Sequence, residues 1–150
     1  MTHKISTTTQ LFISMLIVVL SLSALAACGN NSEEVKSSNP LLEDITFYDE
    51  FRNDKTGKWR EALIAVAEPA EKYAVDYYKD YFKSDDEIHF IYNFQLNTVN
   101  VLKKAGSDTI ILSVYDYVSG EEHDAAKAAG GEFLGEYSID LNTGESKKIQ

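Results

Sequence analysis

The segment Trp59–Phe82, WREALIAVAEPAEKYAVDYYKDYF, has the longest consistent hydrophobic period in the chain. Apolar and aromatic side chains recur in it every three or four residues: Trp59, Ala62, Leu63, Val66, Ala70, Tyr73, Tyr77 and Tyr81. This period lines one face of a helix, so it predicts a helix from about residue 58 to residue 83. Because Pro69 removes a backbone donor, we expect the helix to kink near Glu68 or to divide there.

The sequence after this segment predicts an antiparallel sheet. From Ile88 to Leu96, apolar side chains alternate with His89, Asn93 and Gln95, which is typical of a strand with one buried face. A change of phase at 98–101 indicates a bend or bulge. Two hairpin loops follow, AGSD at 105–108 and NTG at 142–144. We therefore expect an α+β fold, with a long N-terminal helix packed on a curved antiparallel sheet in two layers.

The stretch SGEEHDAAKAAGG, residues 119–131, predicts a short inserted helix near 121–129. Ser119 and Glu122 have the spacing of a capping box, and the two glycines at 130–131 end the helix. Consecutive helical residues point about 100° apart, so the acids beside His123 cannot converge on one ion. The residue four positions after His123 is a lysine and not a second ligand. No metal site and no cofactor are predicted.

His89 and His123 are the candidate catalytic side chains, since histidine beside a carboxylate can transfer protons. The chain has no G-x-S-x-G, H-E-x-x-H, Walker or G-x-G-x-x-G motif. The sequence therefore assigns no catalytic residue. A deep pocket that holds a histidine and a carboxylate within hydrogen-bond distance would favour an enzyme.

Aromatic side chains are concentrated in the second half of the predicted helix. Tyr73, Tyr77 and Tyr81 share its apolar stripe and are expected to cover the sheet. Tyr78 and Phe82 lie off that stripe. These two residues are the candidates for an exposed binding patch, because aromatic side chains often anchor a partner.

The N-terminal sequence is typical of a secretory signal. Residues 11–25 are apolar except for three serines, and no acidic residue occurs before Glu33. Small side chains precede Cys28, so cleavage is expected between Ala27 and Cys28. The alternative is an uncleaved membrane helix, but the apolar run is shorter than the roughly 20 residues of a spanning helix and has no basic flank after it.

Leu25-Ala26-Ala27-Cys28 resembles the lipobox of bacterial lipoproteins. The resemblance implies that the sulfur of Cys28 receives a diacylglycerol and that Cys28 becomes the mature N-terminus. It also implies a location at the cell membrane, lipid-anchored on the extracytoplasmic face. Cys28 is the one cysteine of the chain, so no intramolecular disulfide can form.

The predicted organisation is a signal peptide at 1–27, a lipidated cysteine with a flexible tether at 28–39, and one α+β domain at 40–150. The tether is polar and has too few apolar side chains to form a core. The full chain has a formal net charge of −10. An acidic domain is repelled by phosphates, which excludes nucleic acid and anionic lipid headgroups as direct ligands.

The predicted order of elements is similar to cystatin-like and NTF2-like domains, and EYSIDLNTGESKKIQ (136–150) resembles the last hairpin of PepSY-type domains. The segments DYYKDYFKSDDEIHFIYNF (76–94) and YVSGEEHDAAKAAGGEFLGEY (117–137) resemble small uncharacterised lipoproteins of low-GC Gram-positive bacteria. None of these likenesses brings a catalytic motif. We expect a membrane-tethered, non-enzymatic module that binds a protein or an envelope component. The alternative is a small NTF2-like ligand-binding domain or hydrolase that uses His89 or His123 with a carboxylate.

Overall fold

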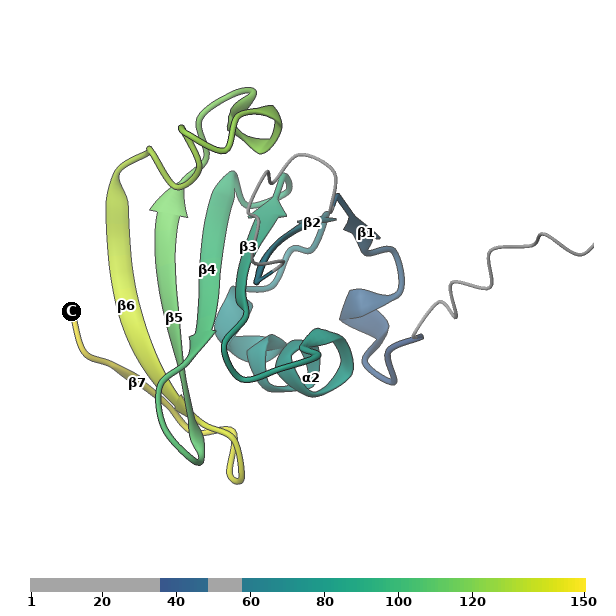
Figure 1. The fold of residues 1–150 in the computed structure, drawn as a ribbon, viewed down its shortest axis with the longest axis vertical. Helices are drawn as coiled ribbons and strands as arrows, with labels where there is room; N and C mark the ends of the chain where they lie inside the picture. The colour runs from purple at the N-terminus through teal and green to yellow at the C-terminus, as the bar shows by residue number, and fades with distance from the viewer. Residues whose placement is uncertain (1–35, 49–57) are drawn as a thin grey trace, which may run out of the picture. The chain divides into compact units, whose positions relative to one another are not determined.

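The computed structural model describes residues 36–48 and 58–150 (Figure 1). Within these two ranges the fold is mainly β, with one short α-helix and three single-turn 3₁₀ helices. The elements in chain order are η1 (Pro40–Leu42), β1 (Thr46–Phe47), β2 (Trp59–Ile64), η2 (Ala70–Lys72), α2 (Ala74–Tyr81), β3 (Ile88–Asn93), β4 (Thr98–Lys104), β5 (Thr109–Asp116), η3 (Glu121–His123), β6 (Phe133–Asp140) and β7 (Ser146–Lys148).

The seven strands form one sheet in which they lie in sequence order. Neighbouring strands are antiparallel except β2 and β3, which are parallel and pair from Trp59↔Ile88 to Ile64↔Asn93. Parallel neighbours cannot be joined by a tight turn, so the chain crosses one face of the sheet between them. That crossover contains η2 and α2. The sheet is therefore mixed and not antiparallel throughout.

The predicted long helix is wrong in its first half. Trp59–Ile64 forms β2, and the helix extends only from Ala74 to Tyr81. Pro69 does not kink a helix but precedes η2 in an extended conformation, with φ −66° and ψ 153°. In the strand, Ala62 and Ile64 pack in the core with α2, and Leu63 packs against the smaller cluster of Phe90, Tyr92 and Val99.

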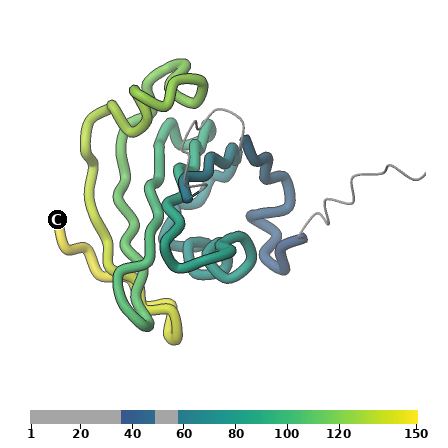
Figure 2. Tube along the Cα trace, viewed as in Figure 1, coloured from purple at the N-terminus to yellow at the C-terminus, as the bar shows by residue number. Residues whose placement is uncertain are grey.

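The sheet was predicted more closely. Both hairpins are confirmed, with β4–β5 joined by residues 105–108 and β6–β7 joined around 142–144. The predicted strand 88–96, however, ends at Asn93, and a turn follows in which Asn97 has φ 55°. The bend or bulge predicted at 98–101 is wrong, because these residues form the regular first half of β4. Phe94 and Leu96 are consequently exposed. The opposite end of the sheet carries the two hairpin turns (Figure 2).

The main core lies between α2 and the sheet. As predicted, Tyr73, Tyr77 and Tyr81 are buried, each at most 6% exposed. They pack with apolar residues from η1, β2, β3, β4, β5 and β6: Leu42, Ala62, Ile64, Ile91, Leu102, Ile110, Leu112 and Ile139. The helix is short, but its aromatic side chains fill much of this core.

A second, smaller core covers the other face of β3 and β4. Phe90, Tyr92 and Val99 are buried there. Ala128 and Ala129, from the connection between β5 and β6, pack against them. Because β3 is buried on both faces, His89 and Asn93 do not form a solvent-facing row and are buried too.

The segment before β1 is fastened to α2. Ser37 Oγ donates to Asp80 (2.5 Å), and Asn39 Nδ2 donates to Asp76 (2.7 Å). Asn39 also caps η1 by accepting the Leu41 N–H at 2.9 Å. The predictions for Ala27, Cys28 and the signal peptide lie outside the described residues. In the part of the chain that is described, no helix is long and apolar enough to cross a membrane.

Candidate functional site

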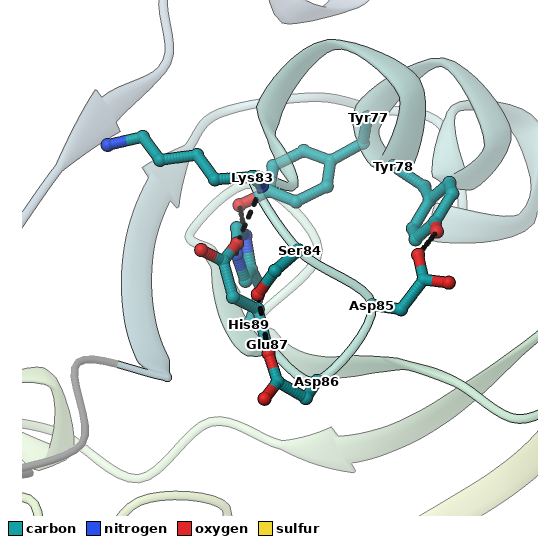
Figure 3. Close-up of polar contacts among 8 residues, drawn as sticks. All are labelled: Tyr77, Tyr78, Lys83, Ser84, Asp85, Asp86, Glu87 and His89. Carbon is teal, nitrogen blue, oxygen red and sulfur yellow. Dashed lines mark hydrogen bonds and ion pairs between the residues drawn. The ribbon is translucent and has the colours of Figure 1, made fainter.

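His89 is the second residue of β3 and lies beneath α2 in a buried hydrogen-bonded chain (Figure 3). Its Nδ1 is 2.9 Å from the Tyr77 hydroxyl, and its Nε2 is 2.9 Å from Glu87 Oε2. These distances fit a ring that accepts the Tyr77 O–H at Nδ1 and donates its Nε2–H to the carboxylate. The same Glu87 oxygen accepts the Lys83 N–H at 3.0 Å. We call Tyr77, His89 and Glu87 the histidine relay.

The histidine relay is closed to solvent. Tyr77 and His89 are fully buried, and Glu87 is 5% exposed. The Phe82 ring stacks on the imidazole at 3.9 Å with an interplanar angle of 18°. Burial, more than any other cause, raises the pKa of Tyr77 well above its usual value, so the hydroxyl stays protonated. A histidine and a carboxylate are thus within hydrogen-bond distance, but the ring is covered and both nitrogens are engaged.

A cleft among the described residues lies elsewhere, beside η1 and the end of β2. It has a volume of about 190 Å³ and is lined by Pro40, Leu41, Asp44, Ile64, Ala65, Val66 and Ala67. None of these side chains belongs to the histidine relay, and none is a histidine. The arrangement around His89 therefore joins α2 to β3 and does not open toward a substrate.

Tyr78 and Phe82, the predicted patch, are both half-buried. Phe82 covers His89, and its ring centroid is 4.8 Å from that of Tyr78. The Tyr78 hydroxyl donates to Asp85 (2.6 Å) and accepts from Lys104 Nζ (3.0 Å). Desolvation and the Asp85 carboxylate raise the pKa of Tyr78. These two aromatic side chains are committed to intramolecular contacts over much of their surface.

His123 lies in η3, at the other end of the sheet from His89, so the fold does not bring the two histidines together. Its side chain is 58% exposed, and Nε2 is 3.5 Å from Glu122 Oε1. Glu122 Oε2 accepts the Tyr117 hydroxyl at 2.7 Å. No cluster of three or more His, Cys, Asp or Glu side chains suited to a metal occurs in the described ranges.

The predicted helix at 121–129 is reduced to the single turn η3, and the predicted capping box is wrong. Gly120 is the N-cap residue, with φ 83°, and no side chain caps the turn. Glu121 is the carboxylate that organises this connection. It is fully buried and accepts the Val118 N–H at 2.8 Å and the Gly130 N–H at 3.1 Å. The two backbone donors satisfy Glu121, and in turn Glu121 holds the loop closed.

Sequence reasoning missed an exposed apolar surface at the upper end of the sheet in Figure 1. Five of the seven large apolar side chains exposed in the described ranges gather there; they lie 37 to 45% exposed. We call this surface the apolar end; it consists of Phe94, Leu96, Val118, Phe133 and Leu134. Antiparallel pairing brings these residues together, because β3 and β5 end where β4 and β6 begin.

Tyrosines of β5 and of the residue after it contact two of the aromatic side chains at the apolar end. The Phe94 and Tyr117 rings meet edge to face at 5.3 Å, and the Tyr117 N–H donates to the Asn97 carbonyl at 3.0 Å. On the next strand, the Tyr115 and Phe133 rings are 5.4 Å apart. Aromatic pairs therefore join the β3–β4 turn to the residue after β5, and β5 to the start of β6.

Buried polar side chains hold the backbone beneath the apolar end. Asn93, which is 1% exposed, accepts the N–H groups of Gln95 (3.2 Å) and Leu96 (3.4 Å) through Oδ1. Its Nδ2 donates to the Val66 carbonyl at 2.9 Å. Glu121 does the same for the connection that follows β5. The exposed apolar side chains thus project from loops fixed by internal hydrogen bonds.

No protein-family model matches the chain, and neither the curated proteins nor the solved structures give a significant match. These comparisons therefore assign no family.

Proposed function

We propose that the chain is a lipid-anchored extracytoplasmic module that binds an envelope partner and catalyses no reaction. The observation that carries this proposal is the apolar end, five exposed apolar side chains at one end of the sheet, on or next to loops held by buried hydrogen bonds. Such patches are uncommon on soluble domains that have no partner. Loops fixed before binding lose little conformational entropy when the partner docks.

Burial of the histidine relay supports binding over catalysis. A general base must reach the proton that it removes, either directly or through one water. Phe82 covers the His89 ring, and Tyr77 and Glu87 occupy its nitrogens. A hydrolase or NTF2-like pocket built on His89 would require α2 to move away from β3. The His123 side chain is 58% exposed, and its Nε2 is 3.5 Å from Glu122 Oε1.

The fold analogies add little to the functional argument. The likeness to cystatin-like and NTF2-like domains depends on a long helix that packs across an antiparallel sheet. Here the helix is short and lies within a parallel crossover. The PepSY-like ending is an analogy of the last hairpin alone. We retain the two-layer description and derive no activity from it.

Anchoring through Cys28 is the second part of the proposal, and it follows from the lipobox pattern. From Cys28 to Lys36, where the described structure begins, there are eight residues, which reach at most about 28 Å when fully extended. The domain would therefore work close to the membrane. Acidic side chains disfavour direct contact with anionic headgroups, and they exclude nucleic acid as a partner.

Fatty-acid labelling tests the anchor. Wild-type chain expressed in a bacterial host should incorporate labelled fatty acid and fractionate with membranes. Cys28→Ser should lose both properties, because serine has no thiol to accept the diacylglycerol. Equal labelling of the two proteins would refute the lipoprotein assignment.

Site-specific photo-crosslinking tests the binding surface. A photoreactive phenylalanine analogue replaces Phe94 in the full chain, within the native envelope. The control places the same analogue at Glu145, an exposed residue of the β6–β7 turn at the opposite end of the sheet. We expect a discrete crosslinked species at position 94 and none at position 145. Equal or absent crosslinking at both positions would contradict the binding function.

A further inference from the structure

The charges around the apolar end restrict the partner that fits it. Between Asp116 and Leu134 the sequence has five carboxylates and one lysine. That lysine, Lys127, is already paired with Asp124 at 3.0 Å. Lys148 adds one cation at the β6 side, where its Nζ is 3.5 Å from the Leu134 carbonyl oxygen. Negative charge is in excess even when Lys148 is included.

The carboxylates differ in how far they are available to a partner. The Glu121 carboxylate accepts two backbone N–H groups of the loop, and the Glu122 carboxylate accepts a hydrogen bond from the Tyr117 hydroxyl. Glu132 is exposed and directly precedes Phe133 and Leu134. Asp116 is half-buried, and its backbone N–H bonds to the Glu132 carbonyl at 2.8 Å. Glu132 and Asp116 thus form the acidic border of the apolar end, because Glu121, Glu122 and Asp124 are engaged within the loop.

From this geometry we infer that the apolar end binds a polypeptide segment with large apolar side chains flanked by Lys or Arg. The inference rests on the proposed binding function and specifies its partner. The apolar contacts would supply most of the affinity, as in other interfaces with a central apolar cluster. The acidic border would select cationic segments and speed their association.

Charge disfavours the other occupants of this surface. A second copy would bring two acidic borders together, which opposes docking. An anionic bilayer would be repelled in the same way. The cleft of about 190 Å³ lies beside η1 and β2 and is not part of the apolar end. A polypeptide that carries both cationic and large apolar side chains complements the apolar end and its acidic border.

Binding of defined peptides tests the inference. The full lipidated chain is placed in nanodiscs of zwitterionic lipid and titrated with three labelled peptides of equal length. The first alternates Lys with Leu and Phe, the second replaces every Lys by Glu, and the third replaces every Leu and Phe by Ser. We expect the first to bind about tenfold or more tightly than either of the others. Empty nanodiscs measure peptide binding to lipid.

Variants show which residues form the binding surface. They also distinguish binding at that surface from general electrostatic attraction of a basic peptide to an acidic protein. Leu134→Ser keeps the charge and should weaken binding of the first peptide about tenfold, as for loss of an interface anchor. Glu132→Gln should slow association and reduce its dependence on salt. Glu145→Gln removes a carboxylate at the far end of the sheet and should change neither quantity.

Each remaining outcome overturns the inference. Equal binding of the acidic peptide, or full binding by Leu134→Ser, would show that the partner chemistry or the surface is wrong. Self-association that is lost in Leu134→Ser would make the occupant a second copy. If crosslinking at position 94 succeeds while the basic peptide shows no preference, the binding function stands and only the partner class is wrong.

Discussion

Both ring nitrogens of His89 are bonded to side chains, and its ring face is covered by Phe82. A polar group in this position stabilises the fold only while its partners are present, because a buried group without a partner loses its hydration and gains nothing in return. The histidine relay is therefore more sensitive to the loss of one member than an exposed ion pair would be.

Tyr77→Phe tests this sensitivity at one atom. The ring remains in the core, but His89 Nδ1 loses the hydroxyl that donates to it. We expect the free energy of unfolding to fall by about 1–3 kcal/mol. Urea unfolding measures the change, with Tyr115→Phe, a half-buried tyrosine outside the histidine relay, as the control. Unchanged stability in Tyr77→Phe would show that the relay contributes nothing to folding.

Glu121 offers a second test at the scale of one residue. Glu121→Ala leaves the Val118 and Gly130 N–H groups without their acceptor, at a cost of about 1–3 kcal/mol for each donor that stays buried. Ser119→Ala should change stability by no more than about 0.5 kcal/mol, because no side chain caps η3. Chemical denaturation of both variants checks the contrast. A larger loss in Ser119→Ala than in Glu121→Ala would restore the capping box.

At the scale of the elements, local patterns predicted some parts of the fold and not others. The two hairpin loops were predictable because turn residues and alternating strands lie next to each other in the sequence. The Trp59–Ile64 strand was mistaken for helix because short apolar runs satisfy both periods. Its partner in the parallel pairing, β3, comes more than twenty residues later, and no local signal specifies that contact.

The candidate site was only partly predictable for the same reason. The buried stripe of Tyr73, Tyr77 and Tyr81 follows from spacing alone. The apolar end does not, since the β3–β4 turn and the β5–β6 connection lie at the same end only after the sheet has formed. Phe94 and Leu96 extend the alternation of β3, so the pattern placed them in the core. The turn that begins after Asn93 exposes them instead.

The connection between β5 and β6 is fixed by a close approach at Gly131. A Cβ atom at this position would be 1.9 Å from the Asp116 carbonyl oxygen, a backbone atom that cannot turn aside. Gly131→Ala should therefore destabilise the domain by about 1–3 kcal/mol or more. Gly106→Ala, in the open β4–β5 turn, has nothing within 4 Å of its Cβ and serves as the control. Thermal unfolding compares the two, and equal melting temperatures would contradict the close packing.

At the scale of the whole domain, one short helix and one sheet enclose a core that contains several tyrosines. Burial is the main reason that the pKa values of Tyr73 and Tyr77 are raised above the usual value for tyrosine. In the unfolded chain both groups would titrate near pH 10. Between that pH and the higher pKa values of the folded state, only the unfolded chain releases these protons.

The stability of the domain should therefore be constant with respect to these groups below about pH 10 and should fall above it. The unfolded state binds fewer protons there, so the free energy of unfolding decreases by up to about 1.4 kcal/mol per pH unit for each buried tyrosine. Urea unfolding at a series of pH values measures this slope, and tyrosinate absorbance follows ionisation directly. Tyr73→Phe should reduce the slope by one such contribution. Ionisation of every tyrosine in one step, without loss of the fold, would show that Tyr73 and Tyr77 are not held in a dry core.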